Sequence, residues 1–204
     1  MIDRRLAMKL DELDGFPEPK LSLEQYETPG EVIRVLLSVA EREFGLECSR
    51  VLDLGAGTGR IGIGAALAGA CEVTCVEVDS EAVKVARRNV KRAGVEDRLE
   101  VVEADVRDFE PEDQYDVTIM NPPFGAQRRG ADRPFVEVAL EASSGVVSLH
   151  RAGTEEFWKR RARELGATCD TVGLVRFPVP AMYPHHRSRI RHVDAAILVF
   201  KKID

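Results

Sequence analysis

The feature of this sequence that most restricts its fold is the alternation of short apolar segments with longer amphipathic ones. The segments that resemble strands are residues 50–54, 72–78, 98–104, 116–120 and 145–150. The helical patterns between and around them are residues 29–44, 60–69, 80–93, 134–142 and 154–165. Gly45, Gly94 and Gly166 follow three of these patterns, as is typical of helix C-termini. Strands that alternate with helices predict a parallel sheet in an α/β domain.

The C-terminal part of the chain departs from this alternation. Residues 168–179 and 193–202 both resemble strands and no helical pattern separates them, so we expect an antiparallel pair at the edge of the sheet. Five parallel strands followed by such a pair are typical of the class I, Rossmann-like methyltransferase fold, whose largely parallel sheet has seven strands. The length of 204 residues suits a single domain. We therefore expect one methyltransferase domain over residues 1–204, with an N-terminal extension at 1–28 and a Rossmann-like core at 29–204.

Composition and charge exclude several classes of protein. The N-terminal residues are charged and lack the apolar stretch of a signal peptide, and no run approaches the ~18 apolar residues of a membrane span, so we expect a cytoplasmic protein. The net charge of -6 argues against a protein that binds nucleic acid with its whole surface. The four cysteines form no Cys-x-x-Cys pair, so we expect buried free thiols rather than a metal site or disulfides at Cys48, Cys71, Cys75 and Cys169.

A glycine-rich loop follows the first predicted strand. It contains Asp53, Gly55, Gly57 and Gly59 and leads directly into a helix of small residues. Glycine lets the backbone turn sharply and lets a ligand approach the main chain, because it has no Cβ. Arg60 occupies the position where a nicotinamide-binding loop has its third glycine. The loop therefore favours S-adenosylmethionine over a dinucleotide.

Acidic residues follow the second and third predicted strands. Glu77 lies about 20 residues after the glycines, where a carboxylate can accept hydrogen bonds from both ribose hydroxyls of a cofactor. Asp105 follows the third strand and can accept the adenine amine. Each acid also has a purely structural interpretation: Asp53 could bind loop amides, Glu77 could cap the next helix and Asp105 could form an Asx turn. The three acids together with the glycine loop favour a cofactor site.

The fourth predicted strand ends in the sequence NPPFG. Because Pro122 and Pro123 cannot continue a sheet, Asn121 lies at the carboxyl end of a strand, where open α/β sheets bind ligands. The amide oxygen of Asn121 and the carbonyl of Pro122 could accept the two hydrogens of an exocyclic amine and direct its lone pair toward a methyl donor. The prolines would stiffen the turn, and Phe124 would offer a ring on which a planar base can stack. The alternative is a Pro-Pro turn with Phe124 in the core.

Two basic segments fall on predicted loops. The first contains Arg128, Arg129 and Arg133, and the second contains Tyr183, His185, His186, Arg187, Arg189 and Arg191. The arginines could bind phosphates beside the pocket, and the aromatic and histidine side chains could contact a splayed nucleotide. Solvent-exposed loops without a ligand are the alternative interpretation. We expect His150 to be structural.

These motifs, in this order, resemble the methyltransferase-like protein 5 family of archaea and eukaryotes, which methylates adenine N6 in small-subunit ribosomal RNA. NPPFG alone matches only the motif Asn/Asp-Pro-Pro-Phe/Tyr/Trp, which enzymes that methylate adenine N6, guanine N2 or glutamine amides share. The segments that narrow the resemblance span nearly the whole chain: FPEPKLSLEQYETP, LDLGAGTGRIGIGAALAGA, IMNPPFGAQRRGADRPFVEVALE, VVSLH and PAMYPHH.

The resemblance implies further site residues and a partner. Gln25, Tyr26 and Thr28 would line the cofactor pocket, with the preceding segment as a lid, although Thr28 before Pro29 is also an N-cap signal. Eukaryotic members have a Cys-rich glycine loop, which this chain lacks, and need a small zinc-binding activator protein that docks along a sheet edge. The strands at 72–78 and 98–104 could offer such an edge or could be buried.

We therefore expect an S-adenosylmethionine-dependent N-methyltransferase that acts on adenine N6, in small-subunit rRNA, with S-adenosylhomocysteine as its product. A protein-glutamine N5 or RNA guanine-N2 methyltransferase is the alternative within the enzyme class, because two carbonyl acceptors suit any planar amine. A catalytically silent RNA-binding module is the alternative of another class, and the intact Asn121, Phe124, Asp53 and Glu77 argue against it. The target nucleotide, the choice between naked RNA and assembled subunit, and the oligomeric state do not follow from the sequence.

Overall fold

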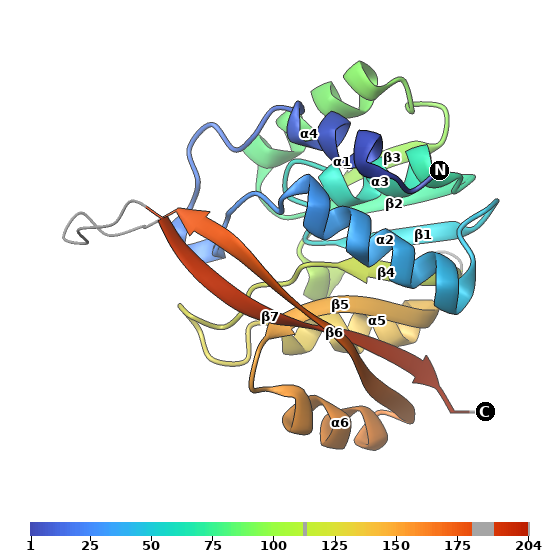
Figure 1. Ribbon diagram of the computed structural model, residues 1–204, viewed down its shortest axis with the longest axis vertical. Coiled ribbons are helices and arrows are strands. Elements are labelled where there is room, and N and C mark those ends of the chain that lie inside the picture. The colour runs from blue at the N-terminus through green and yellow to red at the C-terminus, as the bar shows by residue number, and fades with distance from the viewer. Residues whose placement is uncertain (112–113, 181–189, 204) are drawn as a thin grey trace.

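The computed structural model describes residues 1–111, 114–180 and 190–203 (Figure 1). Its strands are β1 (Arg50–Leu54), β2 (Glu72–Glu77), β3 (Leu99–Glu103), β4 (Tyr115–Met120), β5 (Ser143–Arg151), β6 (Ala167–Pro180) and β7 (Ile190–Lys202). They form one seven-stranded sheet in the order β3-β2-β1-β4-β5-β7-β6. β1 to β5 are parallel, and β7 is antiparallel to both of its neighbours. The expected parallel sheet with an antiparallel C-terminal pair is confirmed.

The helices cover both faces of this sheet. They are α1 (Arg4–Asp11), α2 (Gly30–Phe44), α3 (Arg60–Ala68), α4 (Ser80–Ala93), α5 (Arg133–Ala142) and α6 (Glu155–Glu164), with single 3-10 turns η1 (Leu21–Leu23) and η2 (Val106–Asp108). One apolar cluster joins one face of the sheet to α1, α2, α3 and α4, and a second joins the other face to α5 and α6 (Figure 1). Because both faces are buried, the carboxyl ends of the parallel strands are the natural place for a ligand.

Helix α1 is the one helix of the described residues that the sequence patterns do not predict. Its segment is rich in charge, yet Leu6 and Leu10 lie in the apolar cluster beneath it. The carboxylate of Asp3 accepts hydrogen bonds from the N–H groups of Arg5 (2.9 Å) and Leu6 (3.1 Å), which caps the first turn. The helix thus depends on a cap and on packing against α2 and α3 rather than on a strong local pattern.

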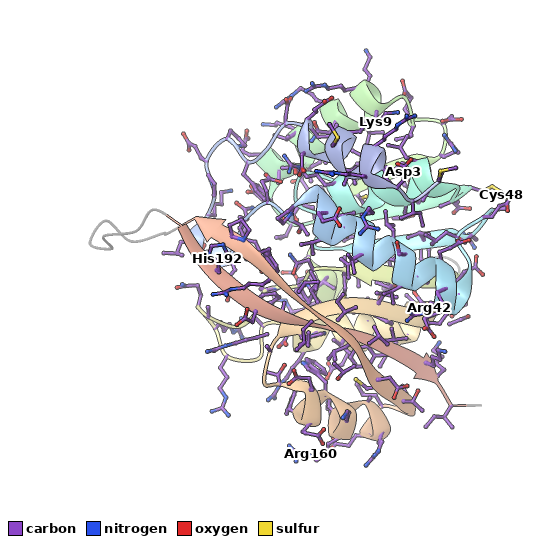
Figure 2. The ribbon with its side chains drawn as sticks, in the orientation of Figure 1. Asp3, Lys9, Arg42, Cys48, Arg160 and His192 are labelled. Atoms are coloured by element: carbon purple, nitrogen blue, oxygen red, sulfur yellow. A yellow bond between two sulfur atoms is a disulfide. The ribbon has the colours of Figure 1, made fainter. Side chains whose placement is uncertain are left out.

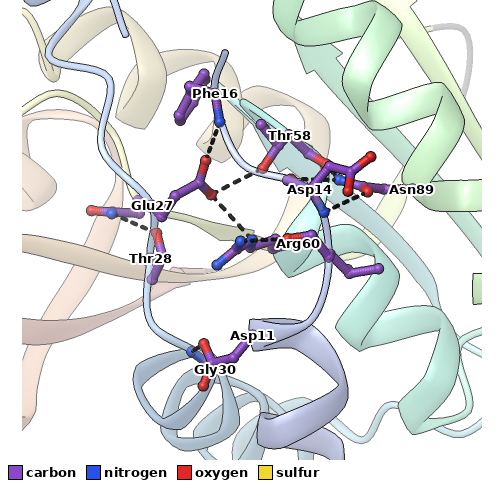
Figure 3. Close-up of polar contacts among 11 residues, drawn as sticks. Asp11, Asp14, Phe16, Glu27, Thr28, Gly30, Thr58, Arg60 and Asn89 are labelled. Carbon is purple, nitrogen blue, oxygen red and sulfur yellow. Dashed lines mark hydrogen bonds and ion pairs between the residues drawn. The ribbon is translucent and has the colours of Figure 1, made fainter. Parts of the chain in front are cut away.

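The end of α1 also caps the start of α2. The Oδ1 atom of Asp11 accepts a hydrogen bond from the N–H of Gly30, at 2.7 Å (Figure 3). The N-cap position of α2 is Pro29, and no side chain at that position makes a capping bond. The interpretation of Thr28 as the N-cap is therefore wrong. The acceptor for the N–H of Gly30 is Asp11, which lies nineteen positions before Gly30 in the chain.

The cysteine prediction is right for one pair and wrong for the other. Cys75 and Cys169 are free and buried, as expected. Cys48 and Cys71 instead form an exposed disulfide, with Cα atoms 4.4 Å apart, and Figure 2 shows Cys48 at the side of the molecule opposite His192. The loops that precede β1 and β2 meet because these strands are adjacent and parallel. The bridge closes the loop of residues between Cys48 and Cys71. In the chain-entropy account, closing a loop of this length contributes about 3 kcal/mol to the free energy of unfolding.

The sheet order decides which strands have a free edge. β3 and β6 are the edge strands, whereas β2 lies between β1 and β3. Residues 98–104 can therefore offer an edge to a partner, and residues 72–78 cannot. In the part of the chain that the structure describes, no helix is both long and apolar enough to cross a lipid bilayer.

Candidate active site

A cavity of about 350 Å³ lies at the carboxyl ends of β1, β2, β3 and β4, beneath the N-terminal segment. Its lining includes the predicted residues Gln25, Tyr26, Thr28, Gly55, Gly57, Glu77, Asp105, Asn121, Pro123, Arg128 and Arg129. The predicted residues Asp53, Gly59, Pro122, Phe124 and Arg133 are described by the structure but are not part of this lining. A cavity of this size and mixed polarity is in the range of small-molecule and cofactor sites.

The glycine loop forms the floor of the cavity after β1. The N–H groups of Gly55 and Ala56 donate to the carbonyl of Val76 at 2.9 and 3.0 Å, which holds the loop against β2. Gly57 has a φ of +56°, and a Cβ on it would lie 2.7 Å from the ring of Phe16. Only glycine satisfies both conditions, so the loop lets the backbone and the N-terminal segment come close together.

Glu77 is a buried acid at the end of β2. Its Oε2 accepts a hydrogen bond from the N–H of Gly57 (2.8 Å) and its Oε1 accepts one from the N–H of Asp79 (2.9 Å). Burial raises the pKa of Glu77. The cap of α4 is Asp79, which accepts a bond from the N–H of Glu81, so Glu77 is not the helix cap. Glu77 lines the cavity, and a carboxylate oxygen can accept more than one hydrogen bond.

Asp105 combines the two interpretations that the sequence left open. It forms an Asx turn by accepting the N–H of Arg107 (2.9 Å), and it also lines the cavity. The guanidinium of Arg107 pairs with its carboxylate, at 2.9 Å from Nε to Oδ1. This side-chain hydrogen bond lowers the pKa of Asp105 to about 2, so the group is charged at neutral pH.

Asp53 lies beneath the glycine loop rather than in the cavity. Its side chain is fully buried, and its Oδ2 accepts a hydrogen bond from the N–H of Gly62 at 2.9 Å. Its Oδ1 has no partner within hydrogen-bond distance among the described residues. Burial raises the pKa of Asp53 from 3.8 to about 7. The structural interpretation, in which Asp53 binds backbone amides, therefore describes its contacts.

Asn121 presents its amide oxygen without a partner. Its Nδ2 donates to Oγ1 of Thr28 at 2.9 Å, which ties the amide to the N-terminal segment. Neither Oδ1 of Asn121 nor the hydroxyl of Tyr26 has a partner within hydrogen-bond distance among the described residues, although both atoms are buried. Burial raises the pKa of Tyr26, and the neighbouring side chain of Asn121 acts in the opposite direction. A buried acceptor without a partner is costly, so this atom is the feature that most clearly calls for a ligand.

Phe124 belongs to a cluster of three aromatic rings. Its ring centroid lies 6.0 Å from that of Tyr26 and 6.4 Å from that of Phe177, a buried residue of β6. Phe124 itself is only half-buried. It packs against the core cluster, as the alternative interpretation of this residue states, and its stacking role stays a prediction.

The predicted basic residues divide into three groups. Arg128 and Arg129 line the cavity, whereas Arg133 begins α5 and stacks on Phe157, 5.2 Å from its ring centroid. Arg191 lies in β7, paired with Val179 of β6. The remaining predicted residues fall outside the part of the chain that the structure describes: Tyr183, His185, His186, Arg187 and Arg189.

His150 is structural, as expected. Its side chain is fully buried, and its Nδ1 lies 3.3 Å from a carboxylate oxygen of Asp132. Its ring also packs on Trp158, with centroids 4.7 Å apart. Burial lowers the pKa of His150, which favours the neutral ring. These contacts hold β5, α5 and α6 together on the side of the sheet away from the N-terminal segment.

The N-terminal segment carries two acids that the motif analysis misses. Glu27 accepts hydrogen bonds from the N–H of Phe16 (2.6 Å) and the hydroxyl of Thr58 (3.0 Å), and it pairs with Arg60 at 3.1 Å (Figure 3). Glu24 is buried and accepts hydrogen bonds from two backbone amides of the loop after Asn121. The only sequence signal is the position of both acids beside Gln25, Tyr26 and Thr28, because their partners lie far away in the chain.

Comparison with known proteins places this geometry in a family. Residues 32–146 match the family described as the methyltransferase small domain. The chain is 34% identical to the Caenorhabditis elegans rRNA N(6)-adenosine-methyltransferase metl-5, covering 100% of both proteins. It is 34% identical to the Drosophila melanogaster rRNA N(6)-adenosine-methyltransferase Mettl5, over 94% of this chain and 92% of that protein.

A solved structure agrees with these matches. A candidate RNA methyltransferase of Pyrococcus horikoshii has a TM-score of 0.91 to this chain, with 39% identity and coverage of 100% of both chains. The expected Rossmann-like methyltransferase fold is therefore confirmed.

Proposed function

This chain belongs to the methyltransferase small domain family and, within it, to the METTL5 rRNA N(6)-adenosine-methyltransferases, and on that premise we propose that it methylates adenine N6 in small-subunit ribosomal RNA. The observation that carries the proposal is the buried, unpartnered amide oxygen of Asn121 at the carboxyl end of β4. An exocyclic amine is the kind of donor that would satisfy it. An rRNA substrate also agrees with a cytoplasmic location.

The residues around the cavity fit S-adenosylmethionine as the methyl donor. Bound there, this cofactor supplies an electrophilic methyl group on a sulfonium centre. Glu77, which lines the cavity, would bind the ribose hydroxyls, and Asp105 would lie near the adenine. Gln25, Tyr26 and Thr28 would cover the cofactor from the N-terminal side, and the backbone of Gly55 and Gly57 would border it.

The chemistry needs positioned acceptors rather than a strong base. The lone pair of an aromatic amine is delocalised into the ring, so the amine is a weak nucleophile. Oδ1 of Asn121 and the carbonyl of Pro122 would each accept one amine hydrogen and direct the lone pair toward the methyl group. The NH2 group of Asn121 donates to Thr28, which leaves the amide oxygen for the substrate amine. Phe124 would stack on the base.

The substrate can be identified directly. The protein is incubated with labelled cofactor and, in parallel, with naked rRNA, assembled small subunits or a glutamine-containing peptide, and the methylated nucleoside or amino acid is determined. N6-methyladenosine supports the proposal. N2-methylguanosine would instead identify an RNA guanine-N2 methyltransferase, and methylglutamine would identify a protein-glutamine methyltransferase. Transfer to none of these substrates would favour an RNA-binding module.

A protein partner is part of this proposal. The resemblance implies a small zinc-binding activator that docks along a sheet edge, and β3 is an edge strand with partly exposed side chains. Pairing with β3 would leave the cavity open, since the partner would add to the outer side of the sheet. The incubations described above are therefore run with and without such a partner.

We expect Glu77→Ala to weaken binding of S-adenosylhomocysteine by roughly 1–3 kcal/mol, because hydrogen bonds to a charged group are lost. Isothermal titration calorimetry measures this directly, and NAD should show no comparable affinity. Glu103 provides a matched control, since it ends β3 opposite Glu77 in the register but is exposed and does not line the cavity. Equal losses in Glu77→Ala and Glu103→Ala would remove Glu77 from the site.

The loop that follows Asn121 should contribute phosphate contacts through Arg128 and Arg129. We expect the double alanine variant to bind RNA more weakly and to reduce the slope of log K against log salt by about 1–2, while cofactor affinity is unchanged. Arg160 and Arg163 form a control pair on α6, none of whose residues line the cavity. A salt slope equal to that of the unmodified protein would return both cavity arginines to ordinary surface residues.

A further inference from the structure

The N-terminal segment from Glu24 to Thr28 contacts three different loops of the site. Gln25 donates to the carboxylate of Asp79 after β2 (2.8 Å), and Glu27 binds the glycine loop after β1. Thr28 orients Asn121 itself. Glu24 also lines the cavity, and its carboxylate reaches beyond Asn121 to the backbone of the loop between β4 and α5.

The carboxylate of Glu24 uses both oxygens on this loop. Oε2 accepts a hydrogen bond from the N–H of Phe124 at 2.8 Å, and Oε1 accepts one from the N–H of Gln127 at 2.9 Å. Glu24 is 7% exposed and has a φ of +52°, so a buried acid is held in an unfavourable backbone conformation. Among the described residues no lysine or arginine forms an ion pair with it. The two amides are therefore its charge-stabilising partners.

The loop that Glu24 holds is irregular, and the packing of the Phe124 ring on Tyr26 and Phe177 also holds it. No helix or strand occurs between β4 and α5, and Gly125 and Gly130 have positive φ values of 75° and 76°. Glycines of this kind leave the unbound backbone many conformations. One of the bonded amides belongs to Phe124, and the other follows it by three residues. The Glu24 carboxylate therefore holds the backbone on both sides of Gly125, while the packing on Tyr26 and Phe177 holds the ring of Phe124.

We propose that Glu24 is a positioning residue that holds the loop after Asn121 in the conformation that receives the base to be methylated. It acts through the backbone of Phe124 and Gln127, not by touching the reacting atoms, and it links the N-terminal lid to the loop that receives the base. The kinetic part of this inference rests on the proposed methyl transfer to an amine. The structural part does not, since it concerns two identified amide groups.

Amide hydrogen exchange followed by NMR tests the structural part. Glu24→Gln keeps the size of the side chain but replaces one acceptor oxygen with an NH2 group. Exchange at Phe124 or Gln127 should accelerate about 10- to 100-fold, the scale of a lost hydrogen bond to a charged group. Amides of α2 and β1 should be unaffected. Glu18→Gln is the matched control, because it makes the same chemical change at an exposed position of the same segment.

Glu27→Gln provides the contrast within the lid. It should weaken binding of S-adenosylhomocysteine about 2- to 10-fold through the glycine loop and leave exchange at Phe124 and Gln127 unchanged. Glu24→Gln should accelerate exchange at Phe124 or Gln127 and leave the affinity for S-adenosylhomocysteine unchanged. If both variants accelerate the same amides, the segment acts as one unit and the assignment to Glu24 is overturned. Unchanged exchange in Glu24→Gln overturns it as well.

Single-turnover methylation tests the kinetic part. Glu24→Gln should slow transfer about 10- to 100-fold, the cost of a displaced acceptor group, with unchanged affinity for S-adenosylhomocysteine. A loss of cofactor affinity equal to the loss of rate would show that Glu24 belongs to the cofactor pocket and would overturn the proposal. If the unmodified protein methylates no acceptor, the proposed function fails, while the exchange measurements still decide what Glu24 does.

Discussion

Asn121→Ala should slow methyl transfer about 100- to 1000-fold, as for the loss of one preorganised transition-state partner. The fold and the cofactor affinity should be kept, because Oδ1 of Asn121 makes no hydrogen bond to the described residues and its intended partner is the substrate. The side chain loses one contact within the protein, its bond to Thr28. Single-turnover methylation, with S-adenosylhomocysteine affinity measured in parallel, separates the two effects.

Conservative variants at the same turn sharpen this test. Asn121→Asp should keep part of the activity, since a carboxylate oxygen still accepts a hydrogen bond. Phe124→Tyr and Phe124→Trp should be tolerated, whereas Phe124→Ala should lose base positioning, because only the first two keep a stacking face. Full activity in Asn121→Ala would mean that the Asn-Pro-Pro-Phe turn has no chemical role, and the case for amine methylation would fail.

Asp53→Asn should change the pH dependence of stability more than any other single carboxyl substitution around the glycine loop. Burial raises the pKa of Asp53 from 3.8 to about 7, so the folded protein binds this proton more tightly than the unfolded chain. The resulting stabilisation is complete below about pH 4 and is lost as the pH rises to about 7. At pH 8 the unmodified protein must hold a buried charge at Asp53 in the folded state. The free energy of unfolding of Asp53→Asn at this pH should therefore exceed that of the unmodified protein by up to about 4 kcal/mol.

Denaturant unfolding at pH 4.5 and pH 8 measures this difference. The amide oxygen of the new side chain can accept the N–H of Gly62, so the bond that holds α3 to β1 is kept. Asp97→Asn serves as the control, because Asp97 is largely exposed. A variant that is equally stable relative to the unmodified protein at both pH values would mean that Asp53 is ionised in the folded state throughout this range.

Sequence patterns that act over a few neighbouring residues made much of the architecture predictable. The core strands read as β-branched, apolar runs, and α2 and α4 end at Gly45 and Gly94, whose positive φ stops a helix. The position of Asn121 followed from two prolines that cannot continue a strand. The Gly-x-Gly-x-Gly spacing located the loop after β1 because a close backbone approach excludes side chains, and Gly57 shows that approach with Phe16. Each of these signals acts over a few neighbouring residues.

The contacts that assemble the site act over long sequence separations. Glu24 reaches amides 100 and 103 positions later, and Asn121 is oriented by Thr28, 93 positions earlier. The type of a residue, such as an acid or a threonine, does not indicate which distant group will become its hydrogen-bond partner in the folded protein. The same holds for Asp53, which the cofactor motif placed at the ligand but which lies beneath the loop.

What the sequence by itself determined is the order of the strands and of helices α2 to α6, the glycine loop and the turn after β4, since periodicity, glycine and proline act locally. The tertiary structure alone decided the cap that α1 supplies to α2, the disulfide between Cys48 and Cys71, and the hold of Glu24 on the acceptor loop. Adjacent parallel strands bring loops from distant parts of the chain to the same edge of the sheet. Which polar groups meet there depends on the packing of the whole domain, because burial forces each of them to find a partner.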